Sequence, residues 1–176
     1  MIEFFNESIL EDAKKQRKEV LIKYLAIVFV YAIISGVLLG WYLTLPYGSK
    51  TIATVKWIHF PLTAVFVVFS FIYLGIYYKR INKYYKLCLN LKNGLKETFE
   101  AQFVGYSQML AIKDGVDCKE LIFNEWNKFK EVYYERRVFV LYEMDFPDIP
   151  EKSMVKFITQ GNVLISYQIL NEKENG

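Results

Sequence analysis

The chain has 176 residues, of which 53% are hydrophobic and 23% charged, and its formal net charge is +3. This length excludes two large domains, and the average composition conceals a strong asymmetry along the chain. Apolar and charged residues are distributed unevenly, so different parts of the chain predict different kinds of element.

Residues 1–20 are predicted to form a short amphipathic helix on the cytoplasmic side of a membrane. The segment Ser8–Glu11 fits a capping box, in which serine and glutamate side chains satisfy free backbone amides at a helix start. Acidic Glu11 and Asp12 precede the basic cluster 14–18, an order that suits the helix dipole. The basic cluster serves mainly as a topology signal in this interpretation, and binding to anionic lipid headgroups is the alternative.

Residues 21–78 are predicted to form a transmembrane hairpin with spans at about 22–45 and 57–78. No Asp, Glu, Lys or Arg lies between Tyr24 and Ser49 or between Trp57 and Tyr78. A bilayer core of about 30 Å needs about 20 apolar residues per helix, and both runs are long enough. A cleaved signal peptide is disfavoured because the first apolar run is too long and a polar segment precedes it.

The distribution of basic residues predicts the orientation of this hairpin. Lysines and arginines are concentrated before the first span and after the second, whereas the connecting loop holds only Lys50 and Lys56. Because basic residues favour the cytoplasmic side, both termini are expected in the cytoplasm, with the protein integral to the plasma membrane.

The first span carries small residues at intervals of four, at Ala32, Gly36 and Gly40. On a helix these residues share one face, which a second helix could approach closely. We expect this face to pack against the second span of the same chain. Packing against another copy or a different membrane protein is the alternative.

Residues 79–97 are predicted to form a connector helix with one apolar seam. The seam follows spacings of three and four and comprises Ile81, Tyr84, Cys88, Leu91 and Leu95. We expect it to pack on the domain that follows, and a self-association stalk between copies is the alternative.

Residues 98–176 are predicted to form a small all-β barrel, so the fold class is an α+β membrane protein with a cytoplasmic barrel. Asp114-Gly115 and the segment Gln160–Asn162 are hairpin signals between strand-like runs. Five or six strands fit this length, and barrel closure would remove exposed sheet edges. Asn124–Glu131 is expected to form a short helix at one barrel end.

The last two predicted strands resemble the end of the OB-like soluble barrel of NfeD-like bacterial membrane proteins. The resemblance rests on Val155, Phe157, Gly161, Val163, Leu164 and Ile165. It implies a non-catalytic module beside the membrane, associated with membrane quality control or assembly. A pleckstrin-homology-like domain ranks second, because that fold ends in a helix whereas Ile165–Leu170 has strand character.

No catalytic, cofactor-binding or metal-binding residues are predicted. Cys88 and Cys118 are far apart in sequence with no histidine ligands nearby, and on the cytoplasmic side both should be reduced. The single histidine, His59, is expected at the outer membrane interface. Phosphate-binding glycine loops and hydrolase motifs are absent from the sequence, so neither an enzyme nor a small-molecule substrate is expected.

Nucleic-acid binding is also not expected. Residues 79–176 carry nearly equal numbers of basic and acidic side chains, so the electrostatic attraction to phosphates is weak. Arg136 and Arg137 lie next to tyrosines, but consecutive strand residues point to opposite faces and do not form one patch.

These patterns predict a non-enzymatic accessory or scaffold protein that contacts the lipid bilayer and binds a protein partner or another copy of itself. The expected partner surface comprises exposed aromatic residues, namely Trp126, Phe129, Tyr133 and Phe146. An oligomeric pore or transport-complex subunit built from several hairpins is the alternative. The richness in Ile, Lys, Tyr, Phe and Asn is typical of an AT-rich bacterial genome.

Overall fold

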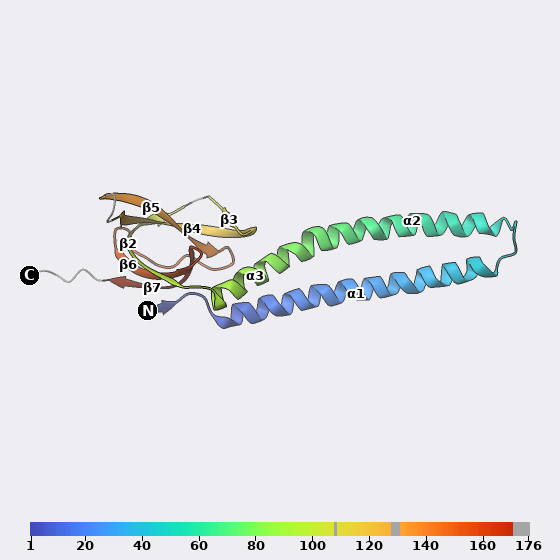
Figure 1. The fold of residues 1–176 in the computed structure, drawn as a ribbon, viewed down its shortest axis with the longest axis horizontal. Helices are drawn as coiled ribbons and strands as arrows, with labels where there is room; N and C mark the ends of the chain where they lie inside the picture. The colour runs from blue at the N-terminus through green and yellow to red at the C-terminus, as the bar shows by residue number, and fades with distance from the viewer. Residues whose placement is uncertain (108, 128–130, 171–176) are drawn as a thin grey trace, which may run out of the picture. The chain divides into compact units, whose positions relative to one another are not determined.

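The computed structural model describes residues 1–107, 109–127 and 131–170 (Figure 1). The chain divides into two compact units. The first unit, called the β domain below, comprises Met1–Ala13 and Lys83–Gly176, and the second, called the helical unit, comprises Lys14–Asn82. Helices and a mixed sheet are both present, so the predicted α+β class is confirmed.

Two helical stretches are long and apolar enough to cross a membrane by length and composition, namely Glu7–Thr44 and Thr51–Asn93. The first stretch is the single helix α1. The second contains three consecutive elements: α2 (Thr51–Ile72), the π-helix η1 (Tyr73–Tyr78) and α3 (Lys79–Asn93). Helix α1 therefore continues without a break through the boundary predicted at residues 20 and 21.

Helix α1 begins one position before the predicted capping box. The Ser8 amide donates to Asn6 Oδ1 at 3.3 Å, and the Ile9 amide donates to the Asn6 carbonyl at 3.1 Å. Asn6 is therefore the residue that caps the helix, and the prediction that Ser8 does so is wrong. Asparagine is at least as good a cap as serine, and it occurs two residues earlier in the chain.

The helical unit is held together by tyrosine side chains. Tyr31 donates its hydroxyl to Thr63 Oγ1 at 3.0 Å and stacks on Phe66 with ring centroids 3.9 Å apart. Nearer the other end of the unit, Tyr73 donates to the Val20 carbonyl at 3.0 Å. Large rings therefore fill the space between the two helices at these contacts.

The sheet has seven strands in the described residues. They are β1 (Ile2–Glu3), β2 (Glu97–Tyr106), β3 (Ala111–Lys113), β4 (Val116–Asn127), β5 (Val132–Leu141), β6 (Met154–Gln160) and β7 (Val163–Leu170). The hydrogen-bonded order is β1-β7-β5-β4-β2-β6, and β6 also pairs with β7. All pairs are antiparallel except β5–β7, which is parallel at Phe139 and Val163.

Both predicted hairpin turns are confirmed. Asp114 and Gly115 have φ values of 54° and 76°, and Lys113 pairs with Val116 across the turn. At the second turn, Gly161 and Asn162 have φ values of 56° and 67°. Positive φ at both central residues is typical of the type I′ turn, whose twist matches that of paired strands.

A short helix was expected at Asn124–Glu131. This prediction is wrong for residues 124–127, because β4 continues to Asn127. Trp126 lies opposite Tyr133 and Asn127 lies opposite Val132 in the antiparallel pairing with β5. Aromatic and β-branched residues favour such cross-strand contacts, which outweigh the local helical pattern.

One hydrophobic core lies on one face of the strands. Its centre is formed by fully buried phenylalanines, with Phe123 5.4 Å from Phe103 and 4.4 Å from Phe157 between ring centroids. These three rings come from β4, β2 and β6, so they connect strands that are distant in sequence.

A second core covers the opposite face of the sheet. Leu87, Cys88 and Leu91 of α3 pack there with strand residues such as Cys118 and Leu141. The chain start joins this domain as well. β1 pairs with β7, and the amides of residues 4 and 5 both donate to the Ile165 carbonyl, at 2.8 and 3.0 Å. Residues Met1–Ala13 thus complete the β domain rather than forming a separate element.

We expect the β domain to lose stability as the pH rises from about 9 to about 11. Burial raises the pKa of Cys88 from about 9 to about 11, although the hydrogen bond with Tyr84 opposes the shift. Burial also raises the pKa of Tyr84, and the nearby Glu143 carboxylate adds to that shift. The folded state favours the protonated thiol, so the contribution of Cys88 to the free energy of unfolding is fully present below pH 9. This contribution falls by at most about 3 kcal/mol as the pH rises through 11.

Thermal unfolding measured through Trp126 fluorescence checks this prediction. Trp41 and Trp57 belong to the helical unit, so replacing both by phenylalanine leaves Trp126 as a probe of the β domain. The variant Cys88→Ala should show a flatter stability profile between pH 9 and 11. An equally steep profile in that variant would contradict the assignment to Cys88.

Candidate partner-binding site

Two exposed aromatic residues form a pair at the end of the β4–β5 hairpin. Trp126 and Tyr133 lie opposite one another, and their rings meet edge to face with centroids 4.8 Å apart. The side chains remain 45% and 63% exposed. Such a pair presents rigid apolar area together with an indole N–H and a phenol hydroxyl, the groups that dominate many protein interfaces.

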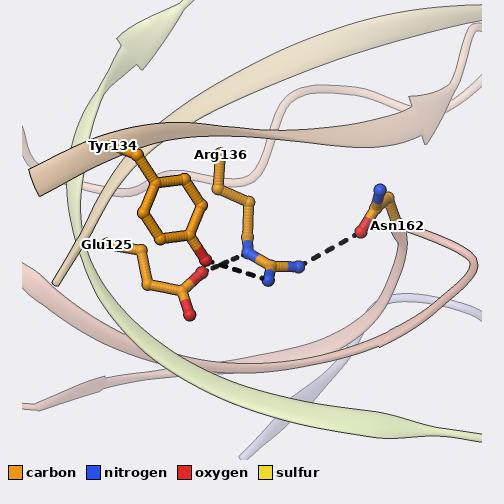
Figure 2. A network of polar contacts seen from close by, with 4 residues as sticks. All are labelled: Glu125, Tyr134, Arg136 and Asn162. Carbon is orange, nitrogen blue, oxygen red and sulfur yellow. Dashed lines mark hydrogen bonds and ion pairs between the residues drawn. The ribbon is translucent and has the colours of Figure 1, made fainter. Parts of the chain in front are cut away.

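A polar network fixes the opposite face of the same hairpin (Figure 2). Arg136 donates from Nε to Glu125 Oε2, from Nη1 to Asn162 Oδ1 at 3.2 Å, and from Nη2 to the Tyr134 hydroxyl at 3.3 Å. Its guanidinium also lies 3.7 Å from the centroid of the Phe99 ring. The network therefore ties β4 and β5 to the β6–β7 turn and to β2.

The protonation states in this network are well defined at neutral pH. Desolvation acts to lower the pKa of Arg136, but hydrogen bonds with Tyr134 and Glu125 and the charge of Glu125 raise it overall. Burial, followed by the hydrogen bond with Glu125, raises the pKa of Tyr134. The arginine is thus a cation and the tyrosine neutral, which suits a structural clamp beneath the aromatic pair.

The structure brings together only part of the predicted partner surface. Phe146 packs 4.7 Å from the Tyr106 ring and 5.2 Å from Lys119 Nζ. Lys119 and Trp126 are seven residues apart on β4, about 23 Å at the usual rise, so Phe146 belongs to a different surface. Phe129 lies outside the described residues.

The predicted small-residue face of α1 is not directed at α2. Ala32, Gly36 and Gly40 are exposed, and a Cβ added to either glycine would meet nothing within 4 Å. The expectation that this face packs within the hairpin is therefore wrong. The ring and hydroxyl of Tyr31 contact α2. The small-residue face begins at the next residue, Ala32, and therefore points away from α2.

The connector seam is largely covered by the chain itself. Cys88 and Leu91 are buried in the second core, whereas Leu95 follows the end of α3 and is 90% exposed. Ile81 is buried and Tyr84 is half-buried, with its hydroxyl donating to Glu143 Oε2 at 3.3 Å. Cys88 and Leu91 thus pack on the sheet of the same chain, as expected for a connector helix, and not in a stalk between copies.

One exposed apolar cluster was missed by the sequence interpretation. Met109, Leu110 and Ile112 precede the Asp114-Gly115 turn and are 80%, 65% and 74% exposed. The signal was present, because several large apolar residues occur beside a turn where polar residues are usual. This cluster on the β3–β4 hairpin is a second candidate contact surface.

The two neighbouring arginines of β5 have different environments, as the alternation of a strand predicts. Arg136 belongs to the polar network, whereas Arg137 contacts Glu135 at 3.0 Å and Glu120 at 3.6 Å. Within the described ranges, no three His, Cys, Asp or Glu side chains are placed to hold a metal ion.

Comparisons of the chain with protein-family models, with curated proteins and with solved structures find no match.

Proposed function

We propose that the chain is a bacterial plasma-membrane protein anchored by the hairpin of α1 and α2, with both termini in the cytoplasm. The length and apolar composition of the two helices support insertion. The basic residues that flank both cytoplasmic ends of the predicted spans support the orientation.

The β domain is in this proposal a closed OB-like barrel. The pairing path β2-β4-β5-β7-β6 returns to β2, which supports closure of five strands into a ring. The parallel contact between β5 and β7 within an otherwise antiparallel ring supports the OB-like type. The resemblance to NfeD-like proteins extends the proposal to membrane quality control or assembly.

The function is that of a non-enzymatic accessory or scaffold protein, in which the β domain binds a protein partner. The Trp126–Tyr133 pair carries this proposal, because both rings are exposed while the network of Arg136 holds the strands beneath them. Preorganised aromatic side chains lose little conformational entropy on binding and are enriched among interface hot spots.

Purification from native membranes tests this surface. Trp126→Ala combined with Tyr133→Ala should release the partner, with at least a tenfold loss of co-purified protein, since each hot-spot residue contributes about 2 kcal/mol. The matched control is Tyr142→Ala, which removes another exposed aromatic ring of the same domain. Loss of the partner in Leu110→Ala but not in the double variant would assign binding to the β3–β4 hairpin instead.

The second candidate function is an oligomeric pore or transport-complex subunit built from several hairpins. The observation that favours it is the open small-residue face of Ala32, Gly36 and Gly40, which the hairpin leaves unused. Such faces allow close approach of another membrane helix. This candidate predicts a fixed homo-oligomer and conductance in liposomes, neither of which the scaffold requires.

A further inference from the structure

An apolar groove lies on the helical unit beside the π-helix. It has a volume of about 560 Å³ and is lined by Tyr24 of α1 and by α2 and η1 residues that include Phe71, Leu74 and Gly75. A Cβ at Gly75 would meet nothing within 4 Å, so the missing side chain leaves open space there. The π-helix is a rare element that frequently occurs at functional sites.

Basic residues occur one to two helical turns beyond the residues that line one end of this groove. Arg17 lies two helical turns before Tyr24 on the same face of α1, and its Nε donates to the Tyr78 hydroxyl at 3.4 Å. Lys79 follows Gly75 by four residues, close to one turn further along. An apolar groove with an arginine, a tyrosine and a lysine within one or two turns of it matches a molecule with a hydrocarbon tail and an anionic head.

The charged residues around Arg17 and Lys79 are also mostly positive. Other basic residues near this end of the helical unit are Lys14, Lys15, Lys18, Lys23 and Arg80, and Glu19 is the acidic residue among them. Basic residues beside a membrane attract anionic lipids, each by a modest amount. The charge complementarity therefore favours a phospholipid over a neutral lipid, and the apolar groove favours a lipid over a free phosphate ion.

We propose that the groove binds one acyl chain of an anionic phospholipid, whose phosphate accepts hydrogen bonds from Arg17 and Lys79. This inference rests on the proposed membrane insertion of the hairpin. It adds a specific lipid site to what would otherwise be a general preference of basic residues for the cytoplasmic leaflet.

Native mass spectrometry of the full chain, released from vesicles of equimolar phosphatidylcholine and phosphatidylglycerol, tests the inference. The wild-type chain should retain phosphatidylglycerol. Arg17→Gln should reduce retention about tenfold, because it removes a charge-assisted contact to phosphate. Gly75→Leu should reduce it to a similar degree by filling the groove, and the Cβ of the new side chain meets nothing within 4 Å in the chain itself.

Ala26→Leu is the matched control, because it places the same leucine side chain at an exposed position of α1 outside the groove. Equal retention of the two lipids by the wild-type chain overturns the inference. Unchanged retention in Gly75→Leu overturns the assignment to the groove. Failure of the wild-type chain to float with the vesicles contradicts membrane insertion, so it overturns the proposed function together with the inference.

Discussion

Replacement of Phe123 by alanine is expected to lower the free energy of unfolding of the β domain by about 3–5 kcal/mol. Phe123 is fully buried, and its ring contacts both Phe103 and Phe157 at the centre of the first core. Truncation removes apolar area and leaves a cavity that the surrounding strands fill only partly. A domain of this size has a total stability of about 5–15 kcal/mol, so the loss is a large fraction of it.

Urea unfolding followed through the fluorescence of Trp126, with Trp41 and Trp57 replaced by phenylalanine, measures this effect. Phe123→Leu is the control, since it keeps most of the buried volume and should cost less than about 2 kcal/mol. A loss below about 1 kcal/mol in the alanine variant would mean that the ring does not occupy a packed core.

The second large effect is expected for Arg136→Leu, which should lower the stability of the β domain by about 2–3 kcal/mol. The Arg136 and Glu125 side chains are only 18% and 19% exposed. Removing the arginine leaves a mostly buried carboxylate without its cationic partner, and it also removes the bonds to Tyr134 and Asn162. The residual exposure of the pair keeps the expected loss below that of a fully buried one.

Pairing Arg136→Leu with Glu125→Leu separates these contributions. The double variant should recover at least half of the stability lost, because the unpaired carboxylate is then gone. Lys156→Ala is the matched control: its ion pair with Glu100 is exposed and should contribute less than about 1 kcal/mol. An effect of Arg136→Leu as small as that of the control would show that the network does not hold the hairpin.

The sequence predicted those features of the fold for which a few neighbouring residues determine the backbone geometry. Asp114-Gly115 and Gly161-Asn162 form the expected tight turns, because few other residues adopt positive φ at both central positions. The alternation of a strand likewise predicted that Arg136 and Arg137 have separate environments.

Features that depend on tertiary contacts were not predictable in the same way. The small-residue spacing of Gly36 and Gly40 marks a face of α1, but which face meets α2 is decided by the ring of Tyr31 and its bond to Thr63. Likewise, no local pattern indicates that residues 2 and 3 pair with β7 at the other end of the chain.

In the candidate site, too, some features follow from local sequence and others depend on tertiary contacts. The sequence predicted Trp126 and Tyr133 as part of a partner surface, but their pairing with each other depends on the register between β4 and β5. The clamp on the other face requires Asn162 from a distant turn to meet Arg136. Such contacts follow from strand order, which single-sequence patterns do not contain.

In the proposed function, a membrane hairpin anchors a domain that binds a protein partner. The most direct test is the native mass and composition of the 20.8 kDa chain extracted gently from its own membrane. We predict a particle that contains a second protein and loses it when Trp126 and Tyr133 are replaced by alanine. A particle that contains only this chain, at a fixed multiple of its mass, would contradict the scaffold function and favour the oligomeric pore.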